Sequence, residues 1–89
     1  MHNEQTTSIF KALADDTRLG IVRQLACDEE GQHCAKVRDS SSLSQPTISH
    51  HLSKLVEAGL VFESKQGKEK IYKLNKELFF AHGIDVDRI

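Results

Sequence analysis

The sequence has no tryptophan, one proline, one tyrosine and two cysteines, and it contains no long hydrophobic run. Its longest apolar stretches, around 59–62 and 78–81, are far shorter than the ~20 residues of a membrane span or the ~7 to 15 of a signal-peptide core. Two cysteines are too few for the disulfide framework of a small secreted domain. These absences predict a soluble cytoplasmic protein with no membrane partner.

The chain has the size and composition of one small globular domain. It has 89 residues, of which 38% are apolar and 28% charged, so we expect a single domain over 1–89. It lacks a glycine-rich phosphate loop, an HExxH motif and a Ser-His-Asp order in a strand-turn-helix context. We therefore predict no enzymatic activity and no cofactor.

Charge is distributed unevenly along the chain although the net charge is only −1. Residues 1–42 hold five basic and seven acidic side chains, and residues 77–89 hold one basic and three acidic. Residues 43–76, in contrast, hold six lysines and three glutamates. A surface that attracts phosphate therefore belongs to the second half of the chain, if the protein has one.

Hydrophobic spacing predicts two helices in the first third of the chain. The first, over 6–13, has a buried stripe of Ile9, Phe10 and Leu13. The second, over 17–26, has a stripe of Leu19, Val22, Leu25 and Ala26. Asp15 or Asp16 offers an N-cap for it. Gly20 costs this helix ~1 kcal/mol relative to alanine, which predicts close packing against a neighbour.

A short helix over 34–39, ended by the serines 40–42, precedes a longer helix over about 44–58. Ser44 at its N-cap and Pro46 in its first turn mark the start of the longer helix. Its expected buried face consists of Ile48, Leu52, Leu55 and Val56. Its outward face is polar and consists of Gln45, Thr47, Ser49, His50, Ser53, Lys54 and Glu57.

After Gly59 the period changes to that of strands. Residues 60–65 and 70–74, separated by 66–69, predict a β-hairpin with a glycine turn and four lysines at or near its tip: Lys65, Lys68, Lys70 and Lys73. Asn75 caps a last short helix over about 76–82, with Leu78 and Phe79 inward, and Gly83 ends it. The predicted fold class is α+β and mostly helical, with four to five helices and a hairpin in the C-terminal half.

Two helices joined by a turn, the second with a polar outward face, form a helix-turn-helix unit, and a basic hairpin directly after it makes a winged helix. Such a helix fits the DNA major groove and its Gln, Ser and Thr side chains pair with base edges, while hairpin lysines meet phosphates. The alternative is a small domain whose polar face is simply solvated, or a winged helix that binds a protein partner. Double-stranded DNA is the partner that the pattern favours.

Three blocks of sequence also resemble a known family. The stretches IFKALADDTRLGIVRQL, LSQPTISHHLSKLVEAGLV and KQGKEKIYKL are similar, in this order and spacing, to the ArsR family of winged-helix transcriptional repressors. The resemblance covers residues 9–75, about three quarters of the chain. It implies a homodimeric repressor that binds an operator near its own promoter and leaves it when an effector, often a metal or metalloid ion, binds.

The resemblance also implies particular contacts. The base-reading positions of the family fall on Gln45, Thr47, Ser49 and His50, next to Ser44 and Lys54, and its wing contacts fall on Lys65, Lys68 and Lys70. For His51, a structural role and a phosphate contact both stay open. The first and last helices form the family's dimer interface, for which the candidates here are Ile9, Phe10, Leu13, Phe79 and Phe80, with Ile84 beside them. Adjacent phenylalanines cannot both face one small core, so one of the last two is expected to meet a partner subunit.

The metal sites of the family are incomplete in this sequence. The Cys-x-Cys positions of arsenic-responsive members fall on His33 and Ala35, with Cys34 between them, and one Cys plus one His cannot form a trigonal thiolate site. The long last helix of zinc-responsive members is also missing, with only His82, Asp85 and Asp87 in that region. Cys27, His33 and Cys34 are the remaining candidates for a metal site shared across a dimer, or for a redox thiol. The sequence therefore predicts neither the arsenic nor the zinc response and leaves the effector open.

Overall fold

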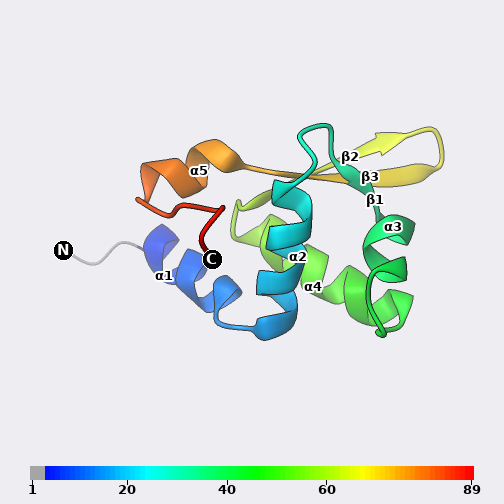
Figure 1. Cartoon of the computed structure of the whole chain (residues 1–89), viewed down its shortest axis with the longest axis horizontal. Coiled ribbons are helices and arrows are strands. Elements are labelled where there is room, and N and C mark those ends of the chain that lie inside the picture. The colour runs from blue at the N-terminus through cyan, green and yellow to red at the C-terminus, as the bar shows by residue number, and fades with distance from the viewer. Residues whose placement is uncertain (1–3) are drawn as a thin grey trace.

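A computed structural model describes residues 4–89, and these form five helices and one three-stranded antiparallel sheet (Figure 1). The molecule is elongated, measuring 42 × 23 × 23 Å. The first and last helices lie at one end of it, and the third helix and the tip of the β-hairpin lie at the other. The predicted fold class, a mostly helical α+β winged helix-turn-helix, is confirmed.

The first two helices are α1 (Glu4–Leu13) and α2 (Asp16–Ala26). Asp15 is the N-cap of α2, where its carboxylate accepts a hydrogen bond from the backbone N–H of Arg18 at 2.9 Å. This hydrogen bond is the main reason why the pKa of Asp15 lies below its usual value. The expectation of close packing at Gly20 is wrong, because a Cβ added there would have no neighbour within 4 Å.

The helix-turn-helix unit consists of α3 (Cys34–Asp39) and α4 (Gln45–Glu57). Ser44 caps α4 as predicted, and its hydroxyl accepts the backbone N–H of Thr47 at 3.4 Å. The predicted inner face of α4 is in the core: Ile48, Leu52 and Leu55 are at most 1% exposed. Burial of this apolar stripe fixes which side of α4 faces outward.

A strand that the sequence pattern did not predict precedes the helix-turn-helix unit. This strand, β1 (Gln32–His33), pairs with β3 (Glu69–Leu74), which also pairs with β2 (Val61–Gln66). Gly31 allows β1 to lie close to β3, because a Cβ at this position would lie 2.9 Å from a methyl group of Ile71. Its φ of 94° also favours glycine. Gln32 is buried, and its side chain exchanges hydrogen bonds with Gln24 at 2.7 and 3.2 Å.

Strands β2 and β3 form the wing, joined by a two-residue turn of Gly67 and Lys68. Because side chains alternate along a strand, the wing has two faces. The inner face carries Val61, Glu63 and Lys65 of β2 and their partners Leu74, Tyr72 and Lys70 of β3. The outer face carries Phe62, Ser64 and Gln66 with their partners Lys73, Ile71 and Glu69. Compared with the prediction, β2 is shifted by one residue and β3 begins one residue earlier, because the pairing continues to the turn.

The last helix is α5 (Lys76–Ala81), capped by Asn75, whose side-chain oxygen accepts the Leu78 N–H at 3.3 Å. Phe79 joins the core, which all the helices described above and the sheet share. Its members include Ile9, Val22, Leu25, Val37, Ile48, Leu52, Leu55, Leu60, Tyr72 and Leu74. Among residues 4–89, no helix has the length and apolar character needed to cross a membrane.

Candidate nucleic-acid interface

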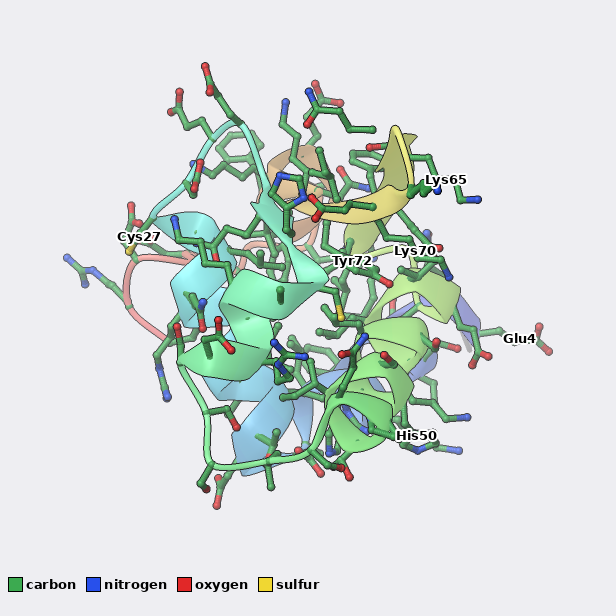
Figure 2. All side chains as sticks on the ribbon, turned by 90° about the vertical axis from the view of Figure 1, so that its right-hand side faces the viewer. Glu4, Cys27, His50, Lys65, Lys70 and Tyr72 are labelled. Atoms are coloured by element: carbon green, nitrogen blue, oxygen red, sulfur yellow. The ribbon has the colours of Figure 1, made fainter. Side chains whose placement is uncertain are left out.

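The first two turns of α4 present polar groups at the end of the molecule where the wing tip lies. Gln45 and His50 are exposed, and Thr47 and Ser49 are half-buried. The hydroxyl of Ser44 serves the helix cap and lies 3.0 Å from the Thr47 hydroxyl. The structure therefore gathers the predicted base-reading side chains at the start of one exposed helix. Figure 2 shows His50, Lys65 and Lys70 together on one side of this surface.

Gln45 is held by an arginine that the sequence analysis missed. Arg38, in the last turn of α3, donates a hydrogen bond from its guanidinium to the Gln45 side-chain oxygen at 2.6 Å. It also contacts the carboxylate of Asp39 at 3.2 Å. The contact leaves the amide N–H groups of Gln45 as its available donors and adds a cation to the same surface. The only sequence signal was a basic residue just before the turn into α4.

The wing lysines differ in how they are neutralised. Lys70 forms an ion pair with Glu63 at 3.0 Å, and the hydrogen bond that its ammonium group donates to this carboxylate raises the pKa of Lys70. Lys65 faces Lys70 directly across the two strands, an arrangement in which like charges repel. Among residues 4–89, Lys65 and Lys68 have no ion pair and are exposed. A phosphate near the wing would relieve this repulsion.

Lys54 lies apart from the wing lysines. Its ammonium group forms an ion pair with Glu57 at 3.6 Å, and its side chain lines a shallow pocket with Lys11 of α1 and Arg18 of α2. Of the predicted DNA contacts, Lys54 is the one that the structure does not bring together with α4's first turns or with the wing.

Arg18 links three parts of the molecule, and the sequence analysis also missed this. Its Nε donates to the Ala12 carbonyl oxygen at 2.6 Å, and a terminal nitrogen lies 3.3 Å from Nδ1 of His51 and another 4.0 Å from the Asp15 carboxylate. Because arginine only donates, Nδ1 of His51 is the acceptor in this contact. His51, with a side chain 15% exposed, ties α4 to the corner between α1 and α2. Of the two roles left open for His51, these contacts favour the structural one.

A cavity of about 410 Å³ separates the start of α3, α4 and the inner face of the wing. We call it the helix–wing cavity; its lining includes Cys34, Gln45, Ser49, Ser53, Lys68, Lys70 and Tyr72. Ser49 faces this cavity, with its hydroxyl 3.8 Å from the Cys34 sulfur. Ser49 is thus turned more toward the wing than the other predicted base-reading residues.

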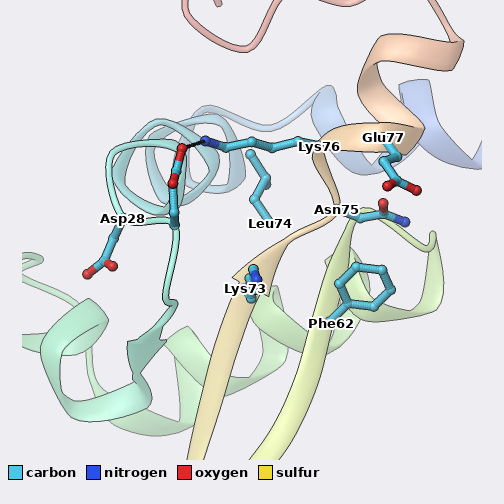
Figure 3. Close-up of a pocket in the computed structure, with 8 residues that line it drawn as sticks. Asp28, Phe62, Lys73, Leu74, Asn75, Lys76 and Glu77 are labelled. Atoms are coloured by element: carbon cyan, nitrogen blue, oxygen red, sulfur yellow. Dashed lines mark ion pairs between the residues drawn. The ribbon is translucent and has the colours of Figure 1, made fainter.

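A second hollow, of about 450 Å³, lies on the outer side of the wing where it meets α5 (Figure 3). Its lining includes Phe62 and three carboxylates, those of Asp28, Glu29 and Glu77, and Glu29 forms an ion pair with Lys76 at 3.8 Å. These carboxylates repel phosphate. Asp28, Glu29 and Glu77 therefore lie on the far side of the wing from the first turns of α4.

The metal-ligand candidates do not converge. Cys27 is exposed at the end of α2, whereas Cys34 starts α3 beside α4, and Figure 2 shows Cys27 at the opposite edge of the view from the wing lysines. His33 contacts Glu69 of the wing, with Nδ1 2.8 Å from the carboxylate. In the part of the chain that the structure describes, no three His, Cys, Asp or Glu side chains form a group suited to a metal ion.

The dimer candidates divide into core and surface residues. Ile9 and Phe79 are 0% and 1% exposed, so their assignment to an interface is corrected: they belong to the core of the single chain. Leu13 is half-buried against that core. Phe10 and Phe80, in contrast, are 55% and 86% exposed on α1 and α5. Phe62, which the sequence analysis did not single out, is a third exposed phenylalanine.

Comparisons with known proteins all identify helix-turn-helix regulators. Residues 13–61 match a family model described as a helix-turn-helix domain. An uncharacterized HTH-type transcriptional regulator of Methanocaldococcus jannaschii is 46% identical over 70 residues, covering 78% of this chain and 76% of that protein. The arsenical resistance operon repressor of Staphylococcus xylosus is 38% identical over 86% of this chain and 72% of its own length. That of Escherichia coli is 45% identical over 79% of this chain and 59% of its own length.

Solved structures agree with this assignment. The crystal structure of an ArsR family transcriptional regulator superposes with a TM-score of 0.81 at 26% identity, covering 93% of this chain and 84% of that one. A homodimeric winged helix-turn-helix DNA-binding domain from Mycobacterium bovis, described as a possible ArsR-family regulator, superposes with a TM-score of 0.77 at 25% identity, covering 90% of this chain and 76% of that one. The order of elements, the polar face of α4 and the basic wing fit these relatives, and the chain belongs to the ArsR family of winged helix-turn-helix transcriptional repressors.

Proposed function

We propose that this repressor binds operator DNA as a homodimer, with α4 in the major groove and the wing on the sugar-phosphate backbone. In each subunit, Gln45, Thr47 and His50 read base edges, and Lys65 and Lys68 contact phosphates. One observation carries the proposal: side chains able to pair with bases and two lysines without ion pairs in residues 4–89 share one end of the molecule. Two such ends related by twofold symmetry match half-sites about one helical turn apart.

The dimer interface is assigned to the opposite end, where α1 and α5 lie. Phe10 and Phe80 expose large apolar side chains there, which water disfavours and a second copy of the chain would cover. The homodimeric state of the relative from Mycobacterium bovis supports self-association of this chain.

Binding is tested by fluorescence anisotropy with the DNA upstream of the protein's own gene, titrated with salt. We expect log K to fall with log salt with a slope of about −4, since Lys65 and Lys68 of the two subunits neutralise about four phosphates. Lys68→Ala should weaken binding to all sequences alike and reduce the slope by about 1 per phosphate lost, whereas Gln45→Ala should relax base preference by ~1 to 3 kcal/mol. Lys73→Ala is the matched control, because Lys73 has the same charge but lies on the outer face of the wing.

A winged helix that binds a protein partner instead of DNA would give a different result. Its affinity for duplexes would be low and equal for Lys68→Ala and Lys73→Ala. A change of base preference in Lys68→Ala but not in Gln45→Ala would show that α4 does not occupy the groove.

We further propose that neither arsenite nor zinc controls this repressor. A trigonal thiolate site needs three sulfur ligands, and the two cysteines lie on different elements: Cys27 follows α2, and Cys34 begins α3 beside Ser49 of α4. Operator release is titrated with arsenite, zinc and copper(I) in the wild type and in Cys34→Ser. Release at sub-micromolar metal that disappears in Cys34→Ser would make Cys34 a sensor ligand and refute this proposal.

A further inference from the structure

The helix–wing cavity is lined mainly by hydrogen-bond donors. The hydroxyls of Ser49 and Ser53 come from successive turns of α4, that of Tyr72 from the inner face of the wing, and the ammonium of Lys68 from the wing turn. The carboxylate in its lining, Glu69, already contacts Nδ1 of His33 at 2.8 Å. A cavity with these groups suits a ligand that accepts several hydrogen bonds and carries negative charge.

Tyr72 contributes a hydroxyl donor to the cavity from the wing. The residue is 4% exposed, and its hydroxyl has no hydrogen-bond partner within residues 4–89. Burial, followed by the nearby Glu63 carboxylate, raises the pKa of Tyr72, so the hydroxyl keeps its proton and remains a donor. The Tyr72 hydroxyl is open to the cavity and is therefore available as a donor to an acceptor from outside the chain.

The position of the cavity identifies the acceptor. It lies between α4, which enters the major groove, and the wing, which meets the backbone of the same duplex. We propose that the helix–wing cavity binds a phosphodiester oxyanion of the DNA strand that passes from α4 to the wing, with Ser49, Ser53 and Tyr72 as donors. This inference rests on the proposed function and adds three backbone contacts to it, two of them from residues that the sequence pattern had not assigned to DNA.

Cys34 provides a reporter inside this cavity. Its sulfur lies 3.8 Å from the Ser49 hydroxyl, whereas Cys27 is exposed on another side of the domain and serves as an internal control. The wild-type protein is treated with iodoacetamide with and without a random-sequence duplex at low salt, and alkylation of each cysteine is followed by mass spectrometry. Duplex of random sequence suffices because phosphate contacts are independent of sequence.

With duplex at about 100 times its Kd, about 99% of the protein is bound. We therefore expect the alkylation rate of Cys34 to fall about tenfold or more, whereas the alkylation rate of Cys27 should change less than about twofold. Inorganic phosphate at the same concentration should leave both rates unchanged. Protection of Cys34 by inorganic phosphate but not by duplex would assign the cavity to a free anion and overturn the proposal.

Two variants test the donors directly. Tyr72→Phe and Ser53→Ala should each weaken binding to every duplex about three- to tenfold but keep the salt slope, since a neutral donor releases no counterion. Ser64→Ala, on the outer face of β2, is the matched control and should bind like the wild type. An unchanged Tm of Tyr72→Phe would show that the loss is not structural.

The two proposals fail in different ways. If the wild type binds no duplex, both are wrong. If Lys68→Ala weakens binding while Cys34 stays unprotected, or while Tyr72→Phe and Ser53→Ala bind normally, DNA binding stands and the assignment of this cavity is wrong.

Discussion

Arg18 contributes more to stability than any sequence pattern would suggest, and Arg18→Met tests this. The substitution keeps the length of the side chain and removes every donor. It leaves the Ala12 carbonyl and Nδ1 of His51 without their partner at 2.6 and 3.3 Å. Ala12 is 6% exposed and the Arg18 side chain 16%, so water replaces these contacts poorly. With two hydrogen bonds lost from a charged donor, the free energy of unfolding should fall by about 2 to 4 kcal/mol.

Urea denaturation at pH 7, followed by circular dichroism, measures this loss. In a domain of this size, Tm should also fall by about 4 to 8 °C per kcal/mol. Arg23→Met is the matched control: Arg23 lies in the same helix and donates to the Ile89 carbonyl at 2.6 Å, but in an exposed position. It should cost at most about 1 kcal/mol.

A double-mutant cycle of Arg18→Met with His51→Leu then measures the contact itself. We expect a coupling free energy of about 1 kcal/mol between the two residues. Equal losses in Arg18→Met and Arg23→Met, or additive effects in the cycle, would refute the view that Arg18 ties α4 to the α1–α2 corner.

Three further substitutions have expected outcomes. Gly20→Ala should raise the free energy of unfolding by about 0.5 to 1 kcal/mol in thermal or urea denaturation, because the added Cβ meets no neighbour and alanine has the higher helix propensity; a loss of stability would mean that the added methyl group clashes with a neighbour. The pKa of Asp15 is lowered in the folded state, so its charge stabilises above about pH 4 and this contribution disappears on acidification. Asp15→Asn should thus cost stability at pH 6 and less at pH 3 in urea titrations, and a constant difference would contradict the cap. Phe80→Ser should yield monomers in analytical ultracentrifugation, whereas Phe62→Ser, the same change at an exposed phenylalanine of the wing, should leave the dimer intact.

The helices and the wing were predictable from the sequence because their signals are local. The apolar spacing of Ile48, Leu52 and Leu55, the Ser44 cap and the glycine turn of the wing each act within a few residues of the chain. The same is true of the polar face of α4 and the lysine-rich segment, which is why the proposed DNA surface could be expected before the fold was known. The two-residue strand β1 could not, since so short a segment shows no period and owes its place to Gly31 and to pairing with β3.

Contacts between residues that are distant in sequence were decided only by the tertiary structure. Periodicity predicted Phe79 inward, but it also predicted Phe10 in the buried stripe of the first helix, and only packing left Phe10 exposed. Nor could periodicity join Arg18 to His51, 33 positions away, or place the Tyr72 hydroxyl over α4. The sequence by itself determined the helices, the wing strands and the polar face of α4 that is proposed to contact DNA, because these depend on local backbone preference and apolar spacing. The helix–wing cavity, the arginine links and the exposed aromatic end depend on how the elements pack, and packing is set by the whole chain at once.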